Sequence, residues 1–555
     1  MADLNSSFSG QYKPLIQANF GWSITAIIIS AFILLPVLSV IFLALFPADN
    51  IWPHLISTTL PRYISTTVFL MISVGVLAGI LGTFTAWFVV RYSFTGSSWL
   101  QWALLMPLAI PGYVGAYALV DLLEYAGPVQ STLRGVFGWS SSQDYWFPEI
   151  RSFGAAVFVL SLALYPYVYL LTRVAFRDQA SSVEEVARSL GASSYKRLFI
   201  INLPLARPAI AAGVAIVMME TVNDFGTVDY FAVQTLTTGI FSVWLQSSNV
   251  GGAAQLACVV LAMIILLVSL EKLSRRKMQF FNMSSKHNKL TKIKLKGFSN
   301  LLAFSCCFVP VLLGFALPLI VLAEHSMSNP KLFLDRALID ATWNTVFTGT
   351  IAAAFTVVLS IFMVFGMKSI KGRLPKITMP ITTIGYAVPG AVLGVGILIP
   401  LAALDNGLAD AIYYITQIDI GLIFTGTSFA IILAYIVRFF AIGQGATEAA
   451  LGRISPNLEH AARSLGKSRT SVLNRIHLPI IKGSLGSAML LVFVDCVKEL
   501  PATLLLRPFN FNTLSTRVHE QASLEDLVNA APAAIYISLV GLCAVVLLAK
   551  ANKLD

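Results

Sequence analysis

The stretch EEVARSLGASSYKRLFIINLP, Glu184 to Pro204, occurs a second time as EHAARSLGKSRTSVLNRIHLP, Glu459 to Pro479. The two copies align without a gap, with Gly191 of the first opposite Gly466 of the second. Both copies are polar and basic, although the chain around them is largely apolar. A polar segment that repeats in register inside an apolar chain indicates a surface that meets a soluble partner twice.

The composition is that of a membrane protein. Of the 555 residues, 57% are hydrophobic and 12% are charged, whereas a soluble domain has about 25% charged residues. A span needs ~20 apolar residues, and solidly apolar runs exclude the alternating strands of a β-barrel. We therefore expect an all-α polytopic fold with twelve spans, at 23–46, 64–90, 99–123, 153–175, 206–225, 253–271, 300–323, 343–366, 376–404, 421–443, 483–504 and 530–550.

The chain is an internal repeat. TTVF at Thr66–Phe69 matches NTVF at Asn344–Phe347, and AIPG at Ala109–Gly112 matches AVPG at Ala387–Gly390. Each copy has six expected spans, an even number, so both copies insert with the same topology and a pathway is expected between them. The Pro-Gly pairs are expected inside the third span of each half, either for close packing or as a bend that lines the pathway. The predicted domains are a first half, a basic linker and a second half, at 1–271, 272–299 and 300–555.

The basic residues predict the orientation. With the N-terminus inside, the inside segments carry about 30 of the 38 Lys and Arg residues, which is a strong positive-inside signal. This places both termini, the linker and both repeated stretches in the cytoplasm. The net charge of +11 is then explained by topology and by contact with anionic membrane lipid, and no nucleic-acid partner is expected. No cleaved signal peptide is expected at 1–22.

Each repeated stretch predicts a helix–glycine–helix elbow. Ser181 or Ser182 can cap the first short helix of copy one, and Gly191 permits the left-handed residue that ends it. The second short helix is expected to end before Leu203-Pro204, because proline blocks helix continuation. The second copy has the same parts. The chain contains no G-x4-G-K-[ST] phosphate loop, so it does not supply its own ATPase.

The pattern E-A-A-x3-G-x9-I-x-L-P resembles the signature of permease subunits of bacterial binding-protein-dependent ABC importers. Two positions depart from it: Val186 replaces an alanine, and His460 stands at the signature glutamate of copy two. In that family each elbow is a coupling helix that docks on an ATPase subunit. The coupling residues implied by this resemblance are Glu184, Glu185, Ala187, Gly191, Leu203 and Pro204, and Glu459, His460, Ala462, Gly466, Leu478 and Pro479.

The resemblance also implies partners and location. It implies a type I importer fold in each half, two ATP-binding cassette subunits, a periplasmic binding protein and the bacterial inner membrane. The chain itself is then a permease and not an enzyme. It binds no cofactor of its own, and ATP is bound by the partner ATPase.

Four acids fall in the spans that follow the elbows. When the register of the elbows is continued, Glu220 aligns with Asp495, and Asp224 aligns with Glu499. Because each pair is spaced i, i+4, both side chains are expected on one helical face. A buried carboxylate costs ~2.5–3.5 kcal/mol on insertion scales and usually faces a cavity. The alternatives are structural roles, with Lys498 neutralising Glu499 or Asp495, or a ring of hard oxygens that transiently binds a cation such as Fe³⁺.

The same region resembles the ferric-iron importer permeases. The likeness is carried by NDFGTVDYFAVQTLTTGI, from Asn223, and KELPATLLLRPFNFNTL, from Lys498. It implies that the chain passes on ferric iron delivered by a periplasmic ferric-binding protein. Related permeases for thiamine, polyamines and aminoethylphosphonate are alternatives. An ion-driven secondary transporter would also fit parallel repeats with intramembrane acids, but it does not explain the paired elbows.

Overall fold

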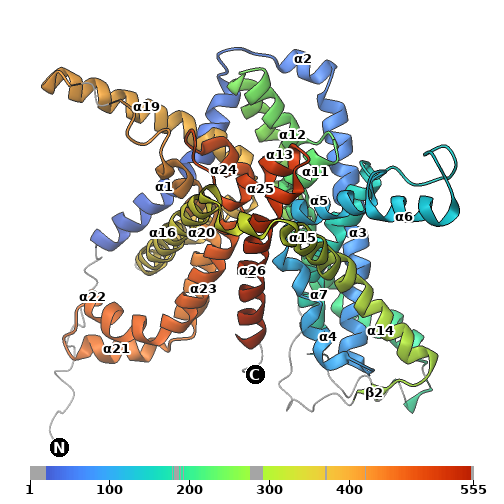
Figure 1. Cartoon of the computed structure of the whole chain (residues 1–555). Coiled ribbons are helices and arrows are strands. Elements are labelled where there is room, and N and C mark those ends of the chain that lie inside the picture. Colours follow the sequence, from blue (N-terminus) through green and yellow to red (C-terminus); the bar gives the residue numbers. More distant parts are fainter. Residues whose placement is uncertain are drawn as a thin grey trace, which may run out of the picture.

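The computed structural model describes residues 20–177, 179, 187, 189–191, 193–275, 292–368, 370, 372–418 and 421–551. In these residues it has 11 helices that are long and apolar enough to cross a membrane, and a twelfth span if one bent helix pair is counted. The prediction of an all-α polytopic membrane protein is confirmed (Figure 1). Glu184, Glu185 and the proposed serine caps of the first elbow lie outside the described residues.

The first half is built from helices of very different lengths. They are α1 (Phe20–Leu45), α2 (Trp52–Ser57), α3 (Leu60–Arg91), α4 (Ser97–Ala103), the short η1 (Met106–Ala109), α5 (Gly112–Leu123), α6 (Pro128–Phe137), α7 (Phe153–Arg177), α9 (Ser194–Arg197), the π-helical η2 (Leu198–Asn202), α10 (Leu203–Asn223), α11 (Gly226–Tyr230), α12 (Leu236–Phe241), η3 (Ser242–Gln246) and α13 (Val250–Arg275).

The second half has a similar series of helices. They are α14 (Phe298–Val311), η4 (Leu312–Ala316), α15 (Leu317–Ser328), η5 (Pro330–Leu334), α16 (Arg336–Met367), α17 (Leu374–Thr382), α18 (Ile384–Ala387), α19 (Gly390–Thr416), α20 (Ser428–Gly452), α21 (Pro456–Ser464), α22 (Arg469–Val472), the π-helical η6 (Leu473–His477), α23 (Leu478–Lys498), α24 (Pro501–Leu506), α25 (Leu514–Ser523) and α26 (Leu527–Ala551).

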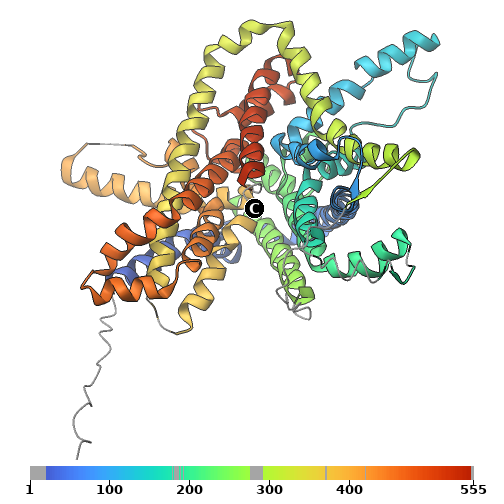
Figure 2. The same cartoon turned by 90° about the horizontal axis from the view of Figure 1, so that it is seen from below.

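The two halves exchange their first spans. Helix α1 packs on α16 and α19 of the second half, while α14 and α15 pack on α3 and α5 of the first (Figure 2). Gly396 allows one of these contacts, because a Cβ at that position would lie 2.2 Å from the carbonyl oxygen of Pro36. Small residues let helix backbones approach closely in membranes. The halves therefore share a hydrophobic core that contains residues from both repeats.

The repeat extends to individual hydrogen bonds. The Thr67 hydroxyl accepts from the Leu236 amide at 3.0 Å, and the aligned Thr345 hydroxyl accepts from the Leu514 amide at 2.8 Å. Thr235 forms a capping box at the start of α12, and the aligned threonine at position 513 forms one at the start of α25. The two halves therefore tie the helix after the fifth span to the second span in the same way.

The end of the linker docks on the first half. Its two-residue strand β2 (Ile293–Lys294) pairs in parallel with β1 (Tyr92–Ser93). The Lys292 ammonium donates to the Val89 carbonyl at 2.9 Å, and Asn300 accepts from the Thr95 amide at 2.9 Å. The end of the linker therefore positions the start of α14 against the first half.

The expected third spans are broken. Segments Ser97–Ala109 and Gly112–Phe137 meet at 92°, and α18 likewise ends before α19 begins at Gly390. Pro111 and Pro389 precede the new helices with the same backbone angles, φ −56° and ψ 145°. Each Pro-Gly pair therefore interrupts the helix, with a bend of 92° in the first half. The proline ring fixes the backbone angle φ and removes an amide donor, which favours the start of a helix.

The expected helix end before each Leu-Pro is also wrong. A single helix runs over Tyr195–Asn223 and another over Arg469–Lys498, each passing through a π-helical turn. Pro204 and Pro479 follow that turn, in the first turn of α10 and α23. We attribute the continuity to the π turn, because its wider spacing relieves the clash of a proline ring with the preceding turn.

Candidate functional site

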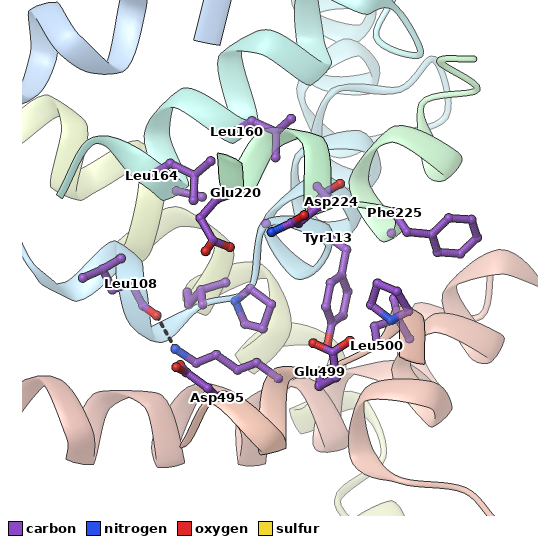
Figure 3. A pocket seen from close by; sticks show the side chains of 18 of the residues that line it. Leu108, Tyr113, Leu160, Leu164, Glu220, Asp224, Phe225, Asp495, Glu499 and Leu500 are labelled. Atoms are coloured by element: carbon purple, nitrogen blue, oxygen red, sulfur yellow. Dashed lines mark hydrogen bonds between the residues drawn. The ribbon is translucent and has the colours of Figure 1, made fainter. Parts of the chain in front are cut away.

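A cavity of about 170 Å³ lies where the two halves meet. Its first-half wall comes from the break before α5 and from α7 and α10, and its second-half wall comes from α20, α23 and the start of α24. All four acids singled out in the sequence line it, namely Glu220, Asp224, Asp495 and Glu499. Figure 3 shows Glu220 and Asp495 on opposite walls.

Glu220 and Asp495 occupy the last turn of α10 and of α23. Asp224 and Glu499, in contrast, follow the ends of these helices, with extended ψ angles of 131° and 118°. Their φ angles of −68° and −67° are still helical, and their amides bond back to Glu220 and Cys496 in the last turns. Both members of each i, i+4 pair therefore face the same cavity, as their spacing predicts.

Asp224 and Glu499 hold the next short helices. The Asp224 carboxylate accepts from the Thr227 amide at 2.9 Å, the Val228 amide at 3.2 Å and the Thr227 hydroxyl at 3.0 Å. The Glu499 carboxylate accepts from the Ala502 amide at 3.1 Å. Side-chain oxygens commonly satisfy the free amides at a helix start in this way. These two acids therefore have a structural role, in addition to facing the cavity.

Each Pro-Gly pair packs beside the acid of its own half. A Cβ on Gly390 would lie 2.3 Å from a Glu499 carboxylate oxygen, and one on Gly112 would lie 3.6 Å from a carboxylate oxygen of Asp224. Pro111 and Gly112 also line the cavity. The first-half pair is therefore a bend that lines the cavity, which is one of the two readings left open by the sequence.

The elbows form a second candidate site. In copy two, the Ser455 hydroxyl caps α21, Glu459 lies in its first turn, and Gly466 has a φ of 75°. Gly191 has a φ of 77° in copy one. Both glycines thus adopt the left-handed conformation predicted for the turn. Figure 1 shows α21 and α22 on the same side of the molecule as the end of α26.

Equivalent elbow residues have the same exposure. Ala187 and Ala462 are each 7% exposed, whereas Leu190 and Leu465 are 81% and 80% exposed. Ala187 and Leu190 therefore do not share one exposed face of the elbow. The alanine packs inward and the leucine is free for a partner. His460 is exposed at the second elbow.

A model of the family described as "Binding-protein-dependent transport system inner membrane component" matches the chain twice, at residues 75–280 and 363–553. The chain belongs to this family. The match covers both elbows and both walls of the cavity, so the cavity lies between two copies of the same family domain.

Relatives of this family differ in how much of the chain they match. The Fe(3+)-transport system permease protein FbpB 2 of Haemophilus influenzae is 27% identical over 88% of this chain and 89% of its own length. The putative ferric transport system permease protein FbpB 1 of the same organism is 24% identical over 89% of this chain and 78% of its own length. The molybdenum transport system permease protein ModB of Escherichia coli is 28% identical, but over 35% of this chain and 86% of its own length.

Two cations, Arg438 and Lys498, line the cavity, and the sequence analysis missed the first of them. Arg438, near the end of the predicted span 421–443, was included among the inside basic residues that predict the orientation. It lies buried within α20, and its guanidinium Nε is 3.1 Å from the Glu499 carboxylate. Glu499 is thus neutralised by Arg438 and not by Lys498. The apolar run on both sides of Arg438, AYIVRFFAI, is the signal that could have placed it inside the membrane.

Lys498 links the two halves. Its ammonium donates to the carbonyl oxygen of Leu108, in the helix break of the first half (Figure 3). The aligned residue in the first half is Asn223, which is 4% exposed and whose amide has no hydrogen-bond partner among the described residues. Among the described residues, Asn223 therefore makes no side-chain contact equivalent to that of Lys498.

The cavity charge is unequal between the repeats. Glu220 and Asp224 come from a half that contributes no cation, because Ala163 and Asn223 stand where the second half has Arg438 and Lys498. Four carboxylates against two cations leave a formal charge of about −2, with ordinary protonation. Among the described residues no three His, Cys, Asp or Glu side chains are grouped as a metal site. In this conformation the acids therefore form an anionic wall and not a coordination cage.

Proposed function

We propose that this chain is the permease of an ATP-driven importer that carries ferric iron across the bacterial inner membrane. The observation that carries this proposal is the cavity between the two family domains, with four carboxylates and two cations. Hard oxygen ligands and negative charge favour a hard cation such as Fe³⁺. The same charge opposes oxyanions, which distinguishes this cavity from one suited to molybdate or sulfate.

The size of the cavity supports an ion as substrate. Sites for small organic molecules usually have about 300–1,000 Å³, whereas this cavity has about 170 Å³. Water occupies ~30 Å³ per molecule in the liquid, so the space fits an ion with a few waters. Thiamine and polyamines fit it less well. The full-length similarity to relatives named as Fe(3+) and ferric permeases points the same way.

The two elbows are the proposed docking sites for the ATPase subunits. Each exposed leucine, at positions 190 and 465, lies three residues after a buried alanine and directly before a left-handed glycine. The leucine side chain is a small apolar projection that suits a groove on a partner. Two such projections correspond to two ATPase subunits, which bind ATP. The distribution of basic residues supports a cytoplasmic position for these elbows and for both termini. A periplasmic ferric-binding protein then delivers iron to the opposite face.

The test is transport by the complete complex in proteoliposomes. Radiolabelled iron on its binding protein is expected to cross the membrane when ATP is present on the elbow side, and uptake should be insensitive to a protonophore. Thiamine, a polyamine, aminoethylphosphonate and molybdate are measured in parallel. ATP-driven uptake of one of these without uptake of iron would refute the substrate. Iron uptake without ATP that a protonophore abolishes would indicate a secondary transporter.

A further inference from the structure

Helix α5 carries a polar stripe that the proposed function does not use. Tyr113, Tyr117 and Asp121 follow one another at four-residue spacing, so they lie on one face of the helix. The stripe begins beside the cavity, which Tyr113 lines. The aligned positions of the second half are Ala391, Val395 and Ile399. The equivalent helix of the second half has apolar side chains at these three positions. Packing alone therefore does not require polar side chains there.

Each member of the stripe faces the other half of the molecule. The Tyr117 hydroxyl is 2.9 Å from Nδ1 of His519 in α25. The Asp121 carboxylate is 2.7 Å from Nε2 of His325 in α15. Figure 3 shows the Tyr113 hydroxyl directed toward the Glu499 carboxylate. We call Tyr113, Tyr117 and Asp121, with His519 and His325, the α5 seam.

A series of side-chain contacts links the outer end of the seam with the cavity wall. At its outer end, Arg151 pairs with Glu124 at 3.3 Å and with Glu525 at 2.7 Å. Its guanidinium lies 5.2 Å from the ring centre of Tyr230. The Tyr230 ring is 4.4 Å from that of Tyr117, which is 5.9 Å from that of Tyr113. Figure 1 shows α11 and α25 on the side opposite α21 and α22.

Tyr113 supplies an independent indication of a ligand. Its side chain is 4% exposed, and its hydroxyl has no hydrogen-bond partner among the residues that the structure describes. A buried hydroxyl without a partner has lost its hydrogen bonds to water without compensation. Such a group at a cavity wall calls for an explanation such as a passing ion or water.

We propose that the α5 seam is the entry route by which a hard trivalent cation passes from the delivery side to the cavity, with Asp121, Tyr117 and Tyr113 as successive oxygen ligands. This inference rests on the proposed function for the identity of the cation. Because Tyr117–His519 and Asp121–His325 each join the two halves, separation of the halves breaks both contacts. The oxygen atoms are then free to bind the cation in place of their histidine partners.

Binding at Tyr117 requires loss of its phenolic proton. The O–H bond breaks, an O–Fe bond forms, and the proton passes to water that enters between the separated halves. No electron is transferred, and the iron stays ferric. Asp121 binds as a carboxylate and needs no proton transfer. Carboxylate and phenolate oxygens are the hard ligands that ferric iron prefers.

The experiment uses the complete reconstituted complex with ferric-loaded binding protein. Asp121→Asn and Tyr117→Phe keep the size of the side chains but remove a ligand oxygen or its acidity, and each is expected to lower iron uptake about tenfold. The matched control is Tyr435→Phe, which removes a buried hydroxyl that bonds Thr503 in the second half. That control should keep wild-type uptake. Thermal unfolding of each variant checks assembly.

Two further measurements distinguish residues that bind the cation from a latch, meaning a contact that only holds the two halves together. His325→Gln replaces the imidazole partner of Asp121 but leaves the carboxylate, so its loss of uptake should be much smaller. Fe³⁺ supplied as ferric nitrilotriacetate should give a phenolate-to-iron charge-transfer band with the wild-type complex, and Tyr117→Phe with Tyr113→Phe should remove it.

The outcomes decide the inference separately from the proposed function. If wild-type complex imports iron and the tyrosine and aspartate variants import it equally well, the entry route is refuted and the proposed function stands. Equal losses for His325→Gln and Asp121→Asn, without the absorption band, would show a latch and also refute the route. If the wild-type complex imports no iron, the proposed function is refuted, and the route loses the cation on which it rests.

Discussion

Replacing Arg438 with alanine, the residue at the aligned position 163 of the first half, breaks a buried ion pair. Arg438 and Glu499 are 9% and 5% exposed at the side chain, with 3.1 Å between the guanidinium and the carboxylate. Removing one partner of a buried pair typically costs ~3–5 kcal/mol, because the other charge is left without compensation. We expect Arg438→Ala to lower the thermal unfolding midpoint of the purified complex strongly.

A double-mutant cycle measures how much of this effect belongs to the pair. Replacing Glu499 by glutamine as well removes the orphaned charge, so the double variant should recover part of the stability lost by Arg438→Ala. Arg453→Ala is the matched control, since Arg453 is an exposed arginine at the end of the same helix. Exposed substitutions of this kind usually stay within about ±0.5 kcal/mol.

The same variant tests the charge of the cavity. Without Arg438 the formal charge becomes about −3 at ordinary protonation, so oxyanions should be excluded still more strongly. Two results would refute the reasoning about the buried pair. One is an Arg438→Ala complex as stable as wild type, and the other is a double variant that loses more stability than the two single variants lose together.

Three further predictions concern backbone features. Gly390→Ala should impair assembly, because its Cβ would lie 2.3 Å from Glu499, whereas Gly407→Ala, with open space around it, should assemble normally in size-exclusion chromatography. Gly466→Val should uncouple ATP hydrolysis from uptake, since a φ of 75° costs an L-residue about 1–2 kcal/mol; wild-type coupling would contradict the elbow assignment. Pro204→Ala should keep iron uptake near the wild-type level, because the helix already continues through this proline, and a large loss would show that the proline itself is needed.

The sequence predicted the parts of the site that depend on the repeat. Gly191 and Gly466 could be assigned a left-handed conformation because the polar elbow recurs in register, and both have it. The same gapless register also paired Glu220 with Asp495 before any contact was known. An internal repeat shows which positions of the two halves are equivalent, however the helices pack.

The features that the sequence could not predict depend on packing between distant residues. Arg438 looked like a topology determinant because its partner, Glu499, lies on a different helix. Proline was expected to end the elbow helices, but π-helical turns before Pro204 and Pro479 carry the chain through. The exchange of α1 between halves left no periodic signal, since its close contacts depend on two isolated glycines, Gly366 and Gly396.

The most direct test of the central claim is iron uptake by the reconstituted complex carrying Glu220→Gln and Asp495→Asn together. These two carboxylates face the cavity from opposite walls (Figure 3), and their replacement leaves side chains of the same size with a neutral cavity wall. We predict that ATP-driven iron uptake is lost, while the complex still assembles with its ATPase subunits and hydrolyses ATP. Uptake of iron at the wild-type rate by this variant would contradict the account.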